Sequence, residues 1–193
     1  MKVDATIRFN DRSKDVPYPP DIRADSIGYG FKDIKGHPEL ASTIPELHQM
    51  DGMQKAIREI CRNETPFFSI GCEKRFGEHD PRKFWGRGFI EFAYNYEVAA
   101  NFENYEQLFD IFRESPIFRK ISAPTLIEWE VAPVRLSDHK IFIHSCSVWV
   151  TVRDRKTHAK ASTAFNQTFA NIGEFLGTIR LKDTNLPPLF SGT

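Results

Sequence analysis

The sequence predicts an α+β protein in which helices cover one face of a mostly antiparallel sheet. Two kinds of pattern carry this prediction: in some stretches apolar residues alternate with polar ones, as in half-buried strands, and in others they recur at helical spacing. In chain order these patterns predict β-α-β-β-α-β-β-α. The first six elements have the ferredoxin-like order, here extended by a further strand and a C-terminal helix. A helix-grip arrangement, in which a curved sheet wraps around a long C-terminal helix, is the alternative.

The chain of 193 residues is long enough for one sizeable core, so we expect a single domain over residues 1–193. Within it we expect a long irregular arm at about 10–42 and a loose tail at about 183–193. Its 26 Lys and Arg residues balance its 26 Asp and Glu residues, and a charged partner therefore requires a local patch.

The cellular setting is predicted from the cysteines and from the absence of targeting signals. Cys61, Cys72 and Cys146 are an odd number without paired spacing, which indicates a reducing compartment rather than a disulfide framework. No stretch of the sequence looks like a signal peptide or a membrane span. We therefore expect a cytoplasmic protein without a membrane partner.

The N-terminal third combines a strand, the long arm and a helix. Apolar residues alternate from Val3 to Phe9, which predicts the first strand. The arm that follows is rich in proline and glycine, as in a lid or a partner-binding segment, and a surface-packed connection is the alternative. Thr43 and Glu46 match a capping box, and apolar residues at helical spacing then predict a helix to about Arg62.

The strands and helices of the remainder follow the same two patterns. Alternation predicts strands near 68–72 and 90–96, and the stretch GEHDPRKFWGRG (77–88) between them is interpreted as a long hairpin tip. Helical spacing predicts a second helix over 105–112 and a third over 165–179.

The clearest hairpin has the turn LSDH (136–139) between two apolar-alternating stretches. Pairing Arg135 with Lys140 across this turn sets Trp129 opposite Cys146 and makes one face of the hairpin apolar. A one-residue slip would place carboxylates among the apolar side chains, so the sequence specifies one register strongly.

The opposite sheet face is predicted to be acidic. Its carboxylates are those of Asp4, Glu73, Glu91, Glu128 and Glu130. Four of them, Asp4, Glu91, Glu128 and Glu130, could hold Mg²⁺ or Mn²⁺ for phosphoryl transfer or hydrolysis, because these ions take oxygen ligands. The acids have no recognised ligand spacing, so we favour a solvated face and expect no metal and no cofactor.

Two basic clusters stand out in this electrically neutral chain. The first is Arg82, Lys83 and Arg87 with Trp85, and the second, before the last helix, is Arg153, Arg155 and Lys156. Cations beside exposed rings are what single-stranded nucleic acid requires, and a helix N-terminus favours phosphate. The alternative is solvated charge that pairs with the acidic second helix.

The sequence contains no GxSxG, Walker, GxGxxG or HExxH motif, which weakens an enzyme interpretation. We therefore expect a binding protein whose partner is single-stranded nucleic acid, another phosphate-bearing anion, or a protein in a larger assembly. The divalent-metal enzyme is one alternative. A purely structural oligomer is another, because Trp149, Ile141 and Ile143 form an apolar strip on the outward side of the hairpin. The position of the last helix decides which sheet face is open.

Overall fold

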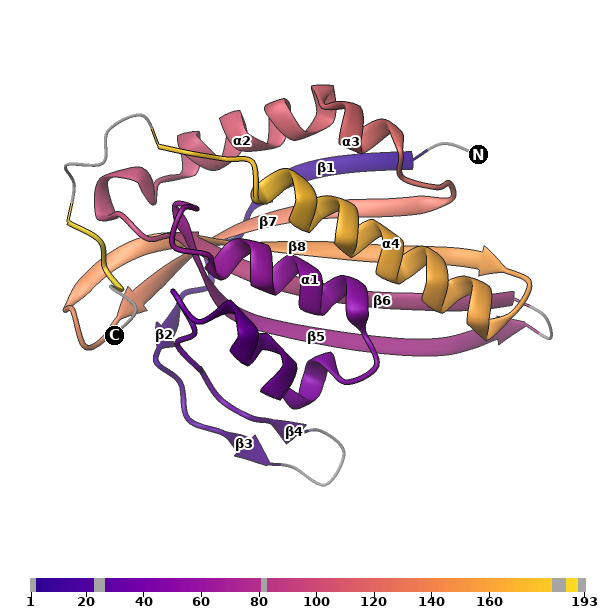
Figure 1. Ribbon diagram of the computed structural model, residues 1–193, viewed down its shortest axis with the longest axis horizontal. Coiled ribbons are helices and arrows are strands. Elements are labelled where there is room, and N and C mark those ends of the chain that lie inside the picture. Colours follow the sequence, from indigo (N-terminus) through magenta and orange to yellow (C-terminus); the bar gives the residue numbers. More distant parts are fainter. Residues whose placement is uncertain (1–2, 23–26, 81–82, 182–186, 191–193) are drawn as a thin grey trace.

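The computed structural model describes residues 3–22, 27–80, 83–181 and 187–190. In these residues the chain forms a mixed sheet with helices packed on one of its faces (Figure 1). The helices are α1 (Asp51–Cys61), α2 (Phe102–Glu114), α3 (Pro116–Arg119) and α4 (His158–Leu176). The fold is therefore α+β, as the sequence predicts.

The six strands of the described sheet lie in the order β1-β7-β8-β6-β5, and β2 pairs with β7 beyond the end of β1. Their bounds are β1 Val3–Phe9, β2 Lys14–Val16, β5 Phe67–Asp80, β6 Lys83–Tyr94, β7 Thr125–Leu136 and β8 Ile141–Arg155. β1 and β2 run parallel to β7, and the other neighbours are antiparallel. This strand order confirms neither the ferredoxin-like nor the helix-grip arrangement.

The core between the sheet and the helices is built around aromatic rings. Trp129 of β7 is fully buried, and its ring meets those of Phe92 on β6 and of Phe109 and Phe112 on α2. Phe92 and Trp129 are both fully buried in this layer. The many phenylalanines of the sequence largely fill this layer.

The C-terminal helix α4 lies beside α1 on the same sheet face (Figure 1). Small residues let the two helices approach closely: a Cβ on Gly173 of α4 would lie 2.4 Å from the Cα of Ala56, and a Cβ on Gly52 of α1 would lie 1.9 Å from the carbonyl oxygen of Asn166. The last helix therefore leaves the opposite sheet face without a helical cover.

The first long helix begins later than the capping box predicts. α1 starts at Asp51, and the residues before it form two 3₁₀ turns, η1 (Pro38–Thr43) and η2 (Pro45–Leu47). Thr43 donates its hydroxyl hydrogen to the Leu40 carbonyl at 2.8 Å instead of capping a helix. Gln49 has a φ of 60°, in the left-handed region, and this interrupts a continuous helix from residue 43. The predicted helix start was wrong.

The β7–β8 hairpin has a register two residues away from the predicted one. Leu136 pairs with Ile141 and Trp129 pairs with Val148, so Arg135 faces Phe142 rather than Lys140. Lys140 has a φ of 55° and belongs to the turn, which therefore covers 137–140 instead of 136–139. Because the shift is even, each side chain keeps its predicted face.

The stretch GEHDPRKFWGRG is mostly strand. β5 continues to Asp80 and β6 starts at Lys83, so the strands are much longer than predicted and the tip is short. The interpretation of 77–88 as a long hairpin tip was wrong, because alternation continues through its glycines. Pro81 and Arg82 lie outside the described residues.

The arm predicted at 10–42 contains β2, a small hairpin of β3 (Asp21–Ile22) and β4 (Ile27–Gly28), and η1. Tyr18 attaches it to the sheet edge by donating its hydroxyl hydrogen to the Ile70 carbonyl at 2.8 Å. In the tail, Leu189 donates its amide hydrogen to the Asn95 carbonyl at 2.9 Å, and the ring of Phe190 packs on that of Phe68. Among the described residues, no helix has the length and apolar character required to cross a membrane.

Candidate functional site

Strand β6 presents large side chains to the face of the sheet that lies opposite the helices, which we call the open face. Along the sequence WGRGF (85–89), glycines alternate with larger residues. A Cβ on Gly88 would lie 2.9 Å from Cζ of Phe165 in α4, so the glycines face the helices. Because successive side chains of a strand point to opposite faces, Trp85, Arg87 and Phe89 all lie on the open face.

Two rings and one cation meet at the middle of the open face. Phe89 of β6 is paired with Trp149 of β8, and their ring centroids are 4.5 Å apart at an interplanar angle of 44°. The Arg87 guanidinium lies over the Trp149 ring, 4.8 Å from its centroid. Both rings are half-buried and Arg87 is exposed. We call Arg87, Phe89 and Trp149 the ring platform.

Charged side chains surround the ring platform. Arg75 on β5 lies directly opposite Arg87, and like charges in this position repel each other unless they are neutralised. Arg75 has an ion pair with Glu73, with 2.6 Å between Nε and Oε1. On the other side, Glu128 of β7 is paired with Trp149. The platform therefore has cations toward one end of the strands and a carboxylate on each flank.

The structure brings the two predicted basic clusters to the same end of the sheet, because Phe84 of β6 pairs with Arg155 of β8. The exposed members are Lys83, Arg87, Arg153 and Lys156. Trp85 stacks on His79, with ring centroids 5.6 Å apart.

Arg155 behaves differently from the rest of its cluster. Its Nη1 donates to the Ala123 carbonyl at 3.0 Å, and its Nη2 lies close to the carbonyls of Ser122 and Pro124. Its guanidinium is therefore engaged in holding the segment that leads into β7. Sequence patterns do not distinguish this role from that of a solvent-facing cation.

The predicted carboxylate cluster is divided by strand β8 and by ion pairs. Glu91 is only 4% exposed, accepts a hydrogen bond from the Ser145 hydroxyl at 2.7 Å and has an ion pair with Lys14. Glu130 has an ion pair with Arg8, and Ser147 lies between it and Glu91 in the sheet.

Asp4 and Glu128 lie on the same face but in different cross-strand rows. Among the described residues, no group of three or more His, Cys, Asp or Glu side chains is placed to hold a metal ion.

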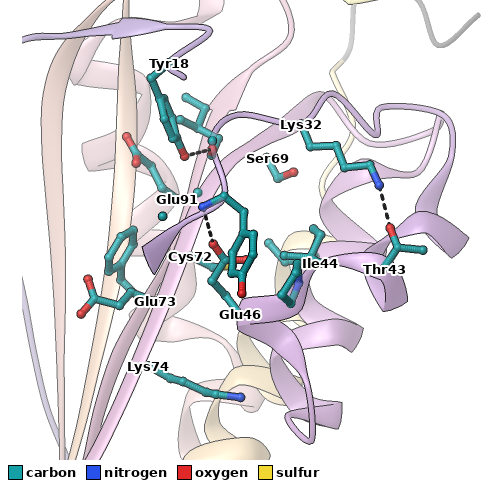
Figure 2. Close-up of a pocket in the computed structure, with 18 of the residues that line it drawn as sticks. Tyr18, Lys32, Thr43, Ile44, Glu46, Ser69, Cys72, Glu73, Lys74 and Glu91 are labelled. Carbon is teal, nitrogen blue, oxygen red and sulfur yellow. Dashed lines mark hydrogen bonds between the residues drawn. The ribbon is translucent and has the colours of Figure 1, made fainter. Parts of the chain in front are cut away.

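A cavity of about 720 Å³ lies between strand β5 and the N-terminal arm (Figure 2). We call it the edge cleft. Its lining includes rings, cations and carboxylates: Lys14, Tyr18, Tyr29, Lys32, Glu46, Cys72, Glu73, Lys74, Arg75, Phe89 and Glu91. The sequence signals it only indirectly, through the length of the arm. Arg75 and Phe89 belong both to this lining and to the open face.

Cys61 and Cys146 are buried core side chains, and Cys72 is partly buried in the lining of the edge cleft. Burial raises the pKa of Cys61 to about 11 and the pKa of Cys72 to about 12, and burial also raises the pKa of Cys146 well above its ordinary value. A thiol with such a pKa stays protonated near neutral pH and is a poor nucleophile.

No known protein family matches this chain, and neither a curated protein nor a solved structure matches it. The function is therefore argued from the geometry of these sites alone.

Proposed function

We propose that this protein binds single-stranded nucleic acid on the open face of its sheet, with bases stacking on the ring platform. The observation that carries the proposal is the contact between Phe89 and Trp149 on a face that no described helix covers, with Arg87 over the Trp149 ring. Proteins that bind single strands without strong sequence preference combine such rings with cations that follow the backbone.

The cations beside the platform have the placement that a sugar-phosphate backbone requires. Arg87 and Arg153 are exposed on β6 and β8, and Arg75 faces Arg87 across the β5–β6 pair. A bound phosphate would relieve the repulsion between Arg75 and Arg87, since it would add negative charge to that which Glu73 supplies to Arg75.

The flanking carboxylates fit the same partner. Carboxylate oxygens accept hydrogen bonds from the exocyclic amino groups of bases, as Glu and Asp do with cytosine N4. Glu128, beside Trp149, would therefore favour a base with an amino group at the stacked position. In this arrangement the rings supply affinity by stacking on bases, the arginines contact the sugar-phosphate backbone, and Glu128 sets the base preference.

Fluorescence anisotropy with labelled single-stranded RNA and DNA of about 20 nucleotides, at low salt, tests this function. We expect Trp149→Ala to weaken binding by about 1–3 kcal/mol, the usual contribution of one stacked base. We expect Arg87→Ala to lower the slope of log K against log salt by about 0.7, the effect of one lost phosphate contact on a single strand.

Two matched controls lie away from the open face. Phe142, 68% exposed, is on the same strand as Trp149 but on the opposite side of the sheet, and Arg119 is an exposed arginine of α3. Phe142→Ala and Arg119→Ala should leave binding unchanged. The proposal fails if the protein does not bind at micromolar concentration, or if the controls weaken binding as much as the platform variants do.

A further inference from the structure

The edge cleft has an unusual relation to strand β5. All seven consecutive residues from 69 to 75 line it. Side chains alternate between the two faces of a strand, so a cavity over one face would touch every second residue. A cavity that touches each residue in turn lies along the edge of the strand, where the backbone groups point.

β5 is the last strand of the sheet on this side. Within the described parts of the chain, no strand pairs with its outer edge, and Tyr18 bonds only one of its carbonyls there, that of Ile70. An edge strand of this kind presents a row of N–H and C=O groups that can pair with another chain.

The far wall of the cleft is the N-terminal arm. Figure 2 shows Lys32, Thr43 and Ile44 on the side of the cleft away from Glu73 and Glu91. The arm bends there at Gly30, whose φ of 84° suits glycine. The arm therefore lies apart from β5, and the edge cleft forms a slot between the two segments. Its volume is in the usual range for ligand sites.

The two sides of the slot differ in chemistry. Toward the helices, the lining has the apolar side chains of Ile44, Ile57 and Cys72, with Ser69 and Lys74 on the same side of β5. Toward the open face it has charged groups, among them Glu73 and Arg75. A strand lying in the slot would thus meet an apolar side with alternate residues and a polar side with the residues between them.

The structure contains one acceptor in this wall that lacks a partner. Oε1 of Glu46 accepts the Tyr29 amide hydrogen at 3.2 Å, whereas Oε2 is buried without a hydrogen-bond partner among the described residues. A buried acceptor of this kind costs free energy until a donor reaches it.

We propose that the edge cleft binds an extended peptide segment of a partner protein, which adds to β5 as a further strand. The partner segment has apolar side chains at alternate positions. Main-chain hydrogen bonds to β5 supply affinity and the apolar side of the slot supplies specificity, as in other cases of strand addition. This site goes beyond the nucleic-acid function proposed above, although Arg75 and Phe89 belong to both surfaces.

Selection from a phage-displayed library of random dodecapeptides on the full chain tests the proposal. We expect enriched peptides with alternating apolar residues that bind the chain but bind Ile44→Glu at least about tenfold more weakly. The matched control is Ile111→Glu, because Ile111 is 54% exposed on α2, away from the cleft. A failure to enrich peptides, or equal binding to both variants, would overturn the proposal.

Amide hydrogen exchange with an enriched peptide gives a second test that needs no variant. We expect exchange to slow by about tenfold or more at alternate amides of β5 between residues 69 and 75, where the strand lines the cleft, because strand addition hydrogen-bonds alternate groups. Unchanged exchange there would contradict strand addition and would mean that the peptide binds through side-chain contacts alone. Protection that rises with the concentration of the protein alone would identify a second copy as the occupant, which also contradicts the proposal. Trp149→Ala should leave peptide binding intact even if nucleic-acid binding fails.

Discussion

Lys35 is a buried ammonium group whose three hydrogen-bond acceptors come from Arg62 and Thr65, in the turn that follows α1. Its Nζ donates to the carbonyls of Arg62 and Thr65 and to the Thr65 hydroxyl, and the side chain is 5% exposed. Lys35 therefore joins the arm to α1, and this junction helps to hold the wall of the edge cleft.

The stability of the protein should depend on pH through Lys35. Burial lowers its pKa from 10.5 to about 8 in the folded state. Between about pH 8 and 10 the unfolded chain thus binds a proton that the folded chain has released, so this group makes the folded state more stable as pH rises. In denaturant unfolding, the free energy of unfolding of the wild type should rise relative to that of Lys35→Met, by at most about 1 kcal/mol per pH unit.

The other titrating groups are the same in both chains, so their contributions cancel in the difference between the two free energies of unfolding. The lowered pKa of Lys35 would be contradicted if the difference in unfolding free energy stayed constant over this pH range, or if the wild type became less stable relative to the variant as pH rises. At neutral pH the group is charged, and the variant removes its hydrogen bond to the Thr65 carbonyl, whereas the Arg62 carbonyl still accepts from the Thr65 amide and hydroxyl.

At the scale of elements, the open face depends on the contact between β6 and α4. Gly86 and Gly88 let the Phe165 ring approach the strand, and the residues between them are directed to the other side. The glycines that look like turn residues in the sequence are thus packing residues inside a long strand. This is why a hairpin tip was expected at 77–88 and a strand pair is found.

Other elements show where sequence patterns suffice. The alternation from Leu126 to Glu130 identifies strand and face correctly, because a half-buried strand has a strict period of two. The register was missed by two residues, because the turn depends on the backbone conformation of Lys140, which hydrophobicity does not record. The start of α1 was missed for the same reason, at Gln49.

The candidate site was predictable in part. The rings and cations of β6 and β8 are visible in the sequence, but their meeting at the ring platform depends on the pairing of Phe89 with Trp149, which is a long-range contact. The edge cleft depends on how the arm folds back over β5. Neither contact leaves a periodic signal in the sequence.

Gly88→Ala should destabilise the protein through the contact of β6 with α4. A Cβ at this position would lie 2.2 Å from the Glu73 carbonyl oxygen and 2.9 Å from the Phe165 ring, so backbone and helix must both shift. Overpacking of this kind costs about 1–3 kcal/mol in unfolding free energy, which chemical denaturation measures.

Gly28→Ala is the matched control for Gly88→Ala. The nearest atom to a Cβ at Gly28 is 3.7 Å away, an ordinary contact, so its effect should stay within about 0.5 kcal/mol. Equal destabilisation by the two variants would mean that loss of a glycine, and not the packing of β6 against α4, sets the cost.

At the scale of the whole molecule, the two proposed sites adjoin along one side of the sheet. Arg75 and Phe89 lie on the open face and also line the edge cleft. A strand added to β5 would extend the sheet beside the ring platform, so a bound peptide and a bound nucleic acid would contact neighbouring residues. The helical layer on the other face contains most of the core, and it contributes Ile57 of α1 to the lining of the edge cleft.

That core makes the molecule sensitive to alkali. Burial raises the pKa of Cys61 to about 11 and of Cys72 to about 12, and burial raises that of Cys146 well above its ordinary value of 9.0. Above about pH 9 the unfolded chain releases thiol protons that the folded chain keeps, so the folded state loses stability as pH rises, by up to about 1 kcal/mol per thiol per pH unit. Denaturant unfolding under reducing conditions between about pH 8 and 10 measures this loss.

Replacing all three cysteines with alanine should flatten this dependence, even though the cavities lower stability at every pH. The buried tyrosines Tyr94 and Tyr105 are present in both chains, and burial, the largest cause of their raised pKa, keeps them protonated in the folded state over this pH range. Cys72→Ala alone should remove about a third of the thiol contribution, since the three groups titrate in the unfolded chain over the same range. An unchanged slope in the triple variant would show that the thiols are accessible to solvent, and that the layer between sheet and helices is more open than the described packing implies.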